Sequence, residues 1–258
     1  MPRPVRDGAN PTIDVLLVGG PTALIELAGL RLLTDPTFDP PGDYPAGQRK
    51  LIKTSPPARR PEEIGAVDCV LLSHDQHPDN LDRSGREFAA SAPITLTTPA
   101  AAARLGGKAI GLAPWETRPL GELTVTAVPA RHGPPGCEPQ LGDVTGFVLA
   151  GSDLPSLYVS GDNAALELVD EIAERFSPVD VALLFAGQAR TALLGEVDLT
   201  LSSASAVEAA RRLRARHVVP LHFEGWAHFK EGLAELREAF AGSGLEVHFL
   251  EPGDGVSL

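Results

Sequence analysis

Cysteine is scarce in this chain, which has only Cys69 and Cys137 among its 258 residues. Two cysteines are too few for a disulfide framework, and Cys69 lies in an apolar run, where we expect a buried thiol. No apolar run approaches the roughly 18 residues of a membrane-spanning helix. The N-terminal sequence Met1-Pro2-Arg3-Pro4 lacks the apolar core of a secretion signal. We therefore expect a cytoplasmic protein without a membrane partner.

Positive charge is also in short supply. The chain has 22 Lys and Arg against 34 Asp and Glu, which gives a formal net charge of −12. An acidic protein gains no electrostatic advantage at a nucleic acid or an anionic membrane, so we expect neither as a partner. The chain also lacks a Gly-x-Ser-x-Gly segment, which leaves a serine hydrolase without support.

The apolar runs that are present predict an α/β protein. Ile13–Val18, Ala23–Leu27 and Leu30–Thr34 are short and separated by glycine, as in an antiparallel meander. Later, strand-like runs alternate with helix-like spacing, and we predict one α/β domain over residues 1–258. The predicted helices are Leu81–Ser91, Pro99–Leu105, Ala164–Phe176, Ser203–Arg214 and Phe229–Ala241, with Asn163 and either Ser202 or Ser203 as N-caps. The later predicted strands are Val67–Leu72, Ile94–Thr97, Leu123–Val128, Gly146–Leu149, Leu157–Val159, Val181–Phe185, Val218–Leu221 and Leu245–Leu250.

Residues 36–66 are rich in proline and short of apolar periodicity. A connection this long inside a compact domain is usually a binding loop or a lid, unless it is disordered. We expect it to be an active-site loop, from which Tyr44, Lys50 and Lys53 could reach a substrate.

Four largely apolar strands each lead into a possible metal ligand. They run into His74 and His77, into His132, into Asp162, and into His222. Strands of one layered sheet present their ends at a common edge, where α/β proteins place their sites. Imidazole and carboxylate are ligands of Zn²⁺ and similar ions. A single histidine could be a surface residue, and Asp162 could cap a helix, but four such strand ends together favour a metal site.

The order of these segments resembles the metallo-β-lactamase fold superfamily, and within it the branch of ascorbate-6-phosphate lactonase. The segments that carry the resemblance are Thr34-Asp35-Pro36, Ser73–Asp82, Val128–Gly133, Tyr158–Asp162 and Pro220–Trp226. The resemblance implies a four-layer αβ/βα sandwich with its ligands in a groove at the sheet edges. It also implies metal-dependent hydrolysis.

One motif of that family is altered here. The family pattern is His-x-His-x-Asp-His, in which the first two histidines bind one metal and the Asp-His pair binds a second. Allowing a one-residue insertion, this chain supplies His74, His77, Asp79 and then Asn80. Asn80 replaces a histidine, and its amide oxygen is a much weaker ligand. The resemblance therefore implies one tight metal site and a weaker or absent second one.

The ligand sets follow from this alignment. The tight site would comprise His74, His77, His132 and Asp162. The weaker site would comprise Asp79, Asp162 and His222. Imidazole-rich ligation suits Zn²⁺, whereas Mn²⁺ or Fe²⁺ would be favoured if carboxylate and water dominate.

Other residues near these ligands have predicted supporting roles. Asp79 is the candidate catalytic residue, which would orient a water molecule or accept its proton, although it could instead be a plain ligand. His228 could contact the substrate, and Asp75 or Asp82 could orient the ligating histidines. His217 and His248 are expected to be structural.

These residues together predict a metal-dependent hydrolase of a small ester, lactone or phosphoester, acting through a metal-activated water. A catalytically silent or metal-free binding protein of the same fold is the main alternative, because Gln76, Pro78 and Asn80 depart from the family's His-x-His-x-Asp-His pattern. A phosphodiesterase is a further alternative.

Overall fold

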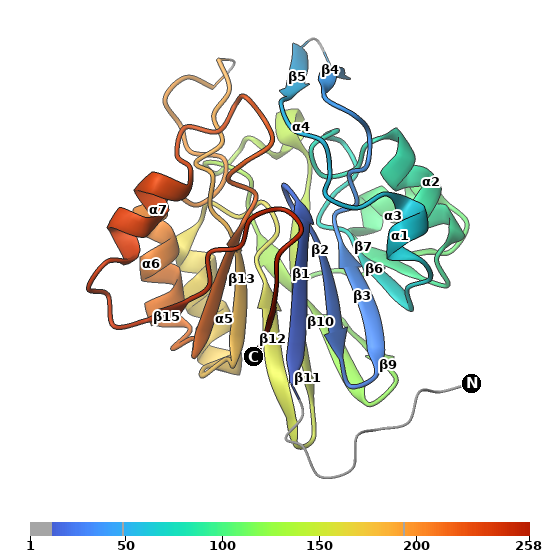
Figure 1. The fold of residues 1–258 in the computed structure, drawn as a ribbon. Helices are drawn as coiled ribbons and strands as arrows, with labels where there is room; N and C mark the ends of the chain where they lie inside the picture. The colour runs from blue at the N-terminus through green and yellow to red at the C-terminus, as the bar shows by residue number, and fades with distance from the viewer. Residues whose placement is uncertain (1–11, 48, 193) are drawn as a thin grey trace.

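Two seven-stranded β-sheets lie face to face, with helices on their outer sides, in the computed structural model of the protein (Figure 1). The structure describes residues 12–47, 49–192 and 194–258, so the expectation about Met1–Pro4 lies outside the described residues. The arrangement is the predicted αβ/βα sandwich, and it confirms the predicted fold class. Among the described helices, none is long and apolar enough to cross a membrane.

The first sheet contains most of the N-terminal strands. In spatial order it consists of β16 (Gly255–Ser257), β1 (Ile13–Gly19), β2 (Thr22–Leu27), β3 (Leu30–Thr34), β6 (Cys69–Leu71), β7 (Thr95–Thr97) and β8 (Ala109–Gly111). The three strands β1, β2 and β3 pair antiparallel in succession, which confirms the predicted meander. The last strands, β6 to β8, pair in parallel.

The second sheet contains the C-terminal strands. In spatial order it consists of β15 (Glu246–Val247), β14 (His217–Leu221), β13 (Val181–Phe185), β12 (Leu154–Val159), β11 (Val144–Gly151), β10 (Leu123–Ala130) and β9 (Thr117–Leu120). Strands β12 to β15 pair in parallel. The ends of β12 and β14 therefore lie at the same edge of the sheet.

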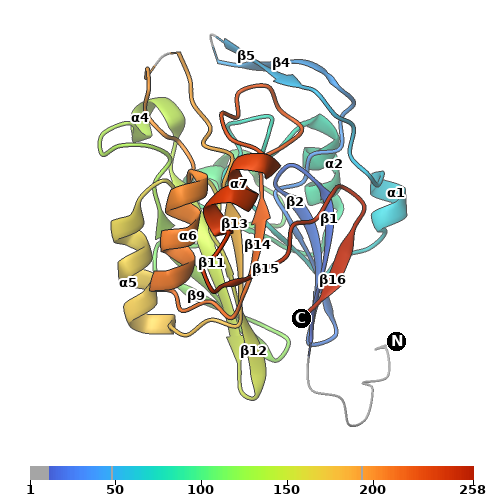
Figure 2. The same cartoon turned by 60° about the vertical axis from the view of Figure 1, so that its left-hand side comes forward.

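Alternating side chains of each strand belong to different apolar layers. Val219 and Leu221 of β14 pack between the two sheets, whereas Val218 packs under the outer helices. The helices on the second sheet are α5 (Leu166–Phe176), α6 (Ser203–Arg212) and α7 (Leu233–Phe240). Those beside the first sheet are α1 (Pro61–Ile64), α2 (Arg83–Ser91) and α3 (Pro99–Leu105), while α4 (Glu138–Leu141) lies near the upper loops (Figures 1 and 2).

Two local expectations turn out differently. Helix α5 begins with Ala165 as its N-cap, because Asn163 uses its side-chain oxygen to accept from the backbone N–H groups of Arg131 and Ala165. The predicted strand Leu245–Leu250 is reduced to the two residues of β15. The predicted cap at Ser202 is confirmed, since its hydroxyl accepts from the backbone N–H of Ser205.

Residues 36–66 contain a hairpin that the sequence did not predict. Its strands are β4 (Gly42–Ala46) and β5 (Arg49–Lys53). Figure 2 shows this hairpin above the ends of both sheets. Its base is fixed by Lys53, which is buried against Asp82 at 3.3 Å and lies 5.5 Å from the centre of the Trp226 ring.

Candidate metal centre

The strand ends bring the predicted ligands together in one buried cluster. His74 follows β6, His132 follows β10 and Asp162 follows β12. One ligand atom from each of these residues and one from His77 all lie within 4.8 Å of one another. His77 is partly exposed, whereas the other three are buried. The structure therefore brings these four predicted ligands together.

His74 and His77 face each other through ring nitrogens. Nε2 of His74 lies 2.8 Å from Nδ1 of His77, and the two rings are nearly perpendicular. Burial and the neighbouring His77 lower the pKa of His74 well below its usual value, and burial and the neighbouring His132 lower the pKa of His77 to about 4. Both rings are therefore neutral at neutral pH, the state in which imidazole binds a metal ion.

A turn begins at His77 and positions the residues that follow it. The backbone N–H groups of Asn80 and Leu81 donate to the carbonyl of His77 at 3.1 and 2.9 Å. Asp79 and Asn80 lie within this turn, and their side chains reach His222 and Asp162.

Ser73 and Asp35 determine which nitrogen of His74 is free. The Ser73 hydroxyl donates to Asp35 Oδ2 at 2.6 Å, so its oxygen accepts from Nδ1 of His74 at 2.9 Å. Nε2 of His74 then carries the lone pair that faces the cluster. The sequence pointed to Thr34-Asp35-Pro36 as a family segment but gave Asp35 no role.

His132 is oriented by a backbone carbonyl from a distant segment. Its Nδ1 donates to the carbonyl of Leu199 at 2.7 Å and lies 3.7 Å from Oδ2 of Asp162. Nε2 is therefore the nitrogen left for a ligand. A backbone carbonyl carries no signature in the sequence, so sequence reasoning could not have found this partner.

Asp75 and Asp82 do not orient the histidines, contrary to expectation. Asp75 accepts from Nε of Arg104 at 3.0 Å. Asp82 pairs with Lys53 and caps α2 through the backbone N–H of Gly85 at 2.8 Å. Both carboxylates are used by cations or a helix end, which a sequence alone does not reveal.

A second group of side chains forms a row beside the first cluster. His222 lies between two carboxylates, with Nδ1 3.0 Å from Asp162 Oδ1 and Nε2 3.4 Å from Asp79 Oδ2. His228 then approaches Asp79 Oδ2 through its Nε2 at 3.1 Å. The predicted second set of Asp79, Asp162 and His222 is therefore contiguous, but its two carboxylates face different nitrogens of His222.

The charges of Asp162, His222, Asp79 and His228 stabilise one another. Burial alone would lower the pKa of His222, but Asp162 and Asp79 raise it to about 10. Burial would raise the pKa of Asp79, yet His228 and His222 hold it well below its usual value. His222 also adopts a left-handed backbone conformation (φ 55°), and its N–H donates to the Gly20 carbonyl at 2.9 Å. Such strain on a residue other than glycine is typical of functional sites.

Asn80 lies where the family has its third histidine, and it behaves as a donor. Its amide nitrogen lies 3.1 Å from Asp35 Oδ2 and 3.2 Å from Asp162 Oδ1. It is completely buried, and its amide oxygen has no hydrogen-bond partner among the described residues. Asn80 therefore links the two carboxylates instead of offering a strong ligand.

The donor set of the first cluster fits a divalent metal ion. Three imidazoles and one carboxylate are a set that Zn²⁺ accepts, and two of the imidazoles are oriented by hydrogen bonds to their other nitrogen. Polar atoms beside it also lack hydrogen-bond partners among the described residues: Oδ1 of Asp79 and Nδ1 of His228 have none, and Nε2 of His222 has only the 3.4 Å ion pair with Asp79.

A small cavity of about 30 Å³ lies directly on this cluster, roughly the space of one water molecule. It is lined by His77, Asp79, His132 and His228 from the site, together with Ala46, Arg49 and Leu51 of the hairpin. The hairpin therefore contributes to the wall of the site.

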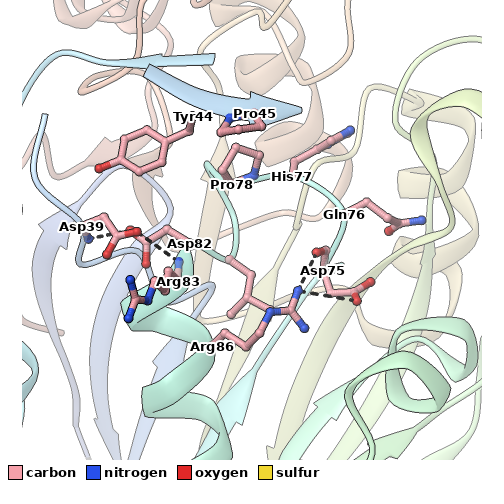
Figure 3. Close-up of a pocket in the computed structure, with 11 residues that line it drawn as sticks. Asp39, Tyr44, Pro45, Asp75, Gln76, His77, Pro78, Asp82, Arg83 and Arg86 are labelled. Atoms are coloured by element: carbon pink, nitrogen blue, oxygen red, sulfur yellow. Dashed lines mark hydrogen bonds and ion pairs between the residues drawn. The ribbon is translucent and has the colours of Figure 1, made fainter. Parts of the chain in front are cut away.

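A larger pocket of about 540 Å³ lies on the other side of the loop that carries His77 (Figure 3). Figure 3 shows Asp39, Tyr44, Arg83 and Arg86 around it. Of the predicted ligands only His77 lines it. Its size alone therefore does not make it the reaction site, although a substrate could extend into it past His77.

Comparison with known proteins places the chain in a family. The family model of the β-lactamase superfamily domain matches residues 30–223, about three quarters of the chain. The chain belongs to this superfamily. A metal-dependent hydrolase of Pyrococcus furiosus is 26% identical over 206 residues, which cover 77% of this chain and 85% of the relative.

Solved structures share the fold at low identity. An isothiocyanate hydrolase from Delia radicum gut bacteria has a TM-score of 0.82 and 20% identity, over 95% of this chain and 98% of that one. A possible metal-dependent hydrolase from Veillonella parvula has a TM-score of 0.79 and 18% identity, over 96% and 99%. The predicted family and fold are confirmed, and the relatives support the prediction of a metal-dependent hydrolase.

Proposed function

We propose that this protein hydrolyses a small-molecule ester, lactone or phosphoester with the help of one tightly bound divalent metal ion. The residues that would hold the ion, Zn²⁺ by the chemistry of the set, are His74, His77, His132 and Asp162. The observation that carries the proposal is the convergence of their ligand atoms to within 4.8 Å of one another in a buried cluster. When bound there, the ion would lower the pKa of a water molecule toward ~7 and polarise the scissile group.

Asp79 is the candidate residue to accept the proton of that water. Its Oδ2 is held by His228 at 3.1 Å and lies 3.4 Å from His222. Its Oδ1 has no partner among the described residues, and Asp79 lines the small cavity. The low pKa of Asp79 keeps the carboxylate ionised at neutral pH, so that it can accept a hydrogen bond from the water and orient it.

His228 would position Asp79 and the substrate. It lines the cavity next to His132, and only 16% of its side chain is exposed. Its Nε2 faces Asp79, while its Nδ1 has no hydrogen-bond partner among the described residues. His228 can therefore hold the carboxylate with one nitrogen and offer the other to a substrate group.

Arg49 would bind the negative end of a substrate or of the transition state. It projects from the hairpin into the cavity wall and donates to the Thr191 hydroxyl. In the described part of the chain, no carboxylate lies within ion-pair distance of its guanidinium. Arg190, which lines the same cavity, is instead neutralised by Asp198 at 2.7 Å and by Glu196. One uncompensated cation at a small cavity favours a small substrate with an anionic group, or one that develops negative charge.

A catalytically silent binding protein remains the second candidate, and Asn80 is the observation that favours it. Its amide nitrogen faces both Asp35 and Asp162, so a second metal would lose a ligand and meet a competing donor. The tight site does not require Asn80. A single-metal hydrolase therefore accounts for the same geometry.

The experiment compares zinc-loaded wild type with Asp79→Asn on a panel of lactones, carboxyl esters and phosphodiesters. Asp79→Asn should keep the tightly bound zinc but lose roughly 10²- to 10⁴-fold in kcat, as expected for a lost proton acceptor. Asp170→Asn, which alters an exposed carboxylate paired with Arg212, is the matched control and should keep full activity. Zinc-loaded wild type that hydrolyses no class of substrate would favour the silent binding protein.

A further inference from the structure

A second cluster of potential ligands lies away from the site described above. His217 is the first residue of β14, Glu246 is the first residue of β15, and His248 follows β15 directly. His222 follows the other end of β14. Five residues of extended chain separate it from His217 by roughly 16 Å, so the two clusters are distinct.

The parallel pairing of β14 and β15 places the three side chains on one face. His217 is the register partner of Glu246, and Val218 is the partner of Val247. Because side chains alternate along a strand, Glu246 and His248 share a face, and His217 joins them there. Val219, two residues further along β14, packs between the sheets, and so does Leu250, which lies beyond the end of β15. The cluster therefore lies at the margin of the inter-sheet core, beside the edge strand β15 (Figure 2).

The separations between the three ligand atoms are those of a metal site. Nδ1 of His217 lies 3.2 Å from Nε2 of His248 and 3.4 Å from Oε1 of Glu246. Nε2 of His248 lies 3.8 Å from the same carboxylate oxygen. Bonds of about 2.1 Å in a tetrahedral zinc site separate neighbouring ligands by roughly 3.4 Å. The three atoms thus occupy three corners of such a site without rearrangement.

We propose that His217, Glu246 and His248 bind a divalent transition-metal ion, Zn²⁺ by the chemistry of the set, at a site separate from the catalytic cluster. Two imidazoles and one carboxylate supply three ligands, and solvent supplies the fourth. Glu246 has 63% of its side chain exposed, so water reaches this position, while the histidines are 17% and 20% exposed. In the described part of the chain, Glu246 has no lysine or arginine partner that would compete for its charge.

The state of the histidines suits this role. Burial, together with the neighbouring His217, lowers the pKa of His248, so its ring is neutral at neutral pH and can donate a lone pair. A simpler interpretation of the short distance between His217 and His248 is a hydrogen bond between their two imidazoles. It leaves the carboxylate of Glu246, at 3.4 and 3.8 Å, without a defined role.

A metal here would stabilise the C-terminal segment. Strand β15 pairs with β14 at only two register positions, and the chain then crosses to the other sheet, where β16 pairs with β1. A metal ion bound by His217, Glu246 and His248 would link the short edge strand β15 to β14. Because binding favours the folded state, zinc should raise the melting temperature through this site.

The test uses metal-depleted full-length protein titrated with zinc alone. The double variant His217→Gln/His248→Gln should bind one equivalent fewer than wild type. It should keep its hydrolytic activity, because neither residue lies in the catalytic cluster. A double variant with the stoichiometry of wild type would overturn the proposal.

Two further variants keep the test decisive. Glu246→Gln changes only an exposed side chain, so it should fold normally, and it should weaken zinc binding at this site by roughly tenfold or more. Unchanged affinity in Glu246→Gln would overturn the proposal even if the double variant does not fold. His132→Gln removes a ligand of the catalytic cluster. Any rise in melting temperature that zinc still causes in His132→Gln therefore comes from the site of His217, Glu246 and His248. Loss of that rise on adding Glu246→Gln supports the proposal, whatever the hydrolytic activity proves to be.

Discussion

Asp35 holds Ser73 by two hydrogen bonds of 2.6 Å, one from the backbone N–H and one from the hydroxyl. The Ser73 oxygen is thereby left to accept from Nδ1 of His74 at 2.9 Å. Asp35 itself has a left-handed backbone (φ 29°), and burial raises its pKa to about 7. A costly buried carboxylate thus determines the tautomer of one candidate ligand.

Removing the Ser73 hydroxyl should weaken metal binding without removing a ligand. In Ser73→Ala, His74 loses the acceptor that fixes its tautomer, and losses of about 10- to 100-fold in metal affinity are typical of such partners. Competition with a chelator of known affinity would measure this. Ser156→Ala is the matched control, because Ser156 also donates its N–H and hydroxyl to one carboxylate, that of Asp180. Equal affinities for the two variants would contradict the assigned role of Ser73.

Restoring the family's histidine at position 80 should create a stronger second metal site. Asn80→His would replace an amide that donates to Asp162 by an imidazole between Asp162 and Asp35. We expect an additional equivalent of retained metal, measured by elemental analysis after dialysis. Asn80→Asp is a useful comparison, since it adds charge without an imidazole. A metal content in Asn80→His equal to that of wild type would show that Asn80 does not limit the second site.

The unfolding free energy of the metal-free protein should depend on pH because of His222. Asp162 and Asp79 raise the pKa of His222 in the folded protein from its usual 6.5 to about 10. The stabilisation by protonated His222 is therefore fully present below pH 6.5 and is lost as the pH rises toward 10. The difference in unfolding free energy between wild type and His222→Gln should shrink across this window in denaturant titrations. A difference independent of pH would contradict the ion pairs of His222 with Asp162 and Asp79.

Arg49 should affect the binding of anionic substrates. Loss of a hydrogen bond to a charged group costs about 1.5 to 3 kcal/mol, so Arg49→Gln should raise KM for an anionic substrate by roughly 10- to 100-fold. The KM of neutral substrates of the same size should change little, because Arg49 would meet negative charge on them only in the transition state. Arg190→Gln is the control in the same cavity, because Asp198 and Glu196 already neutralise that cation. Equal effects on neutral and anionic substrates would remove Arg49 from the binding site.

The strand ends that carry the ligands could be predicted from the sequence, because each follows a recognisable apolar run. The apolar strands that lead to His74, His132, Asp162 and His222 could be recognised individually. Asp162 and His222 follow strands of one parallel set, so they had to meet at one edge. His74 follows β6 of the other sheet and joins them because the two sheets lie face to face. The altered motif also indicated that Asn80 would be a much weaker ligand than histidine, and its amide nitrogen does face Asp162.

Partners from distant segments could not be predicted. Leu199 orients His132 through its backbone carbonyl, which any residue could supply. The hairpin of β4 and β5 is anchored by Lys53 on Asp82 and Trp226, contacts that follow from tertiary packing alone. His228 lies beside Asp79 because the loop after His222 folds back, and its spacing in the sequence carries no such information.

Metal content of the purified protein tests whether the buried cluster binds a metal ion. Wild type and His132→Gln would be loaded with zinc, dialysed against a weak chelator and analysed for metal, with unfolding curves to confirm that both are folded. We expect His132→Gln to retain one equivalent less than wild type, because His132 completes the buried cluster with His74, His77 and Asp162. Equal metal content in the two folded proteins would contradict it.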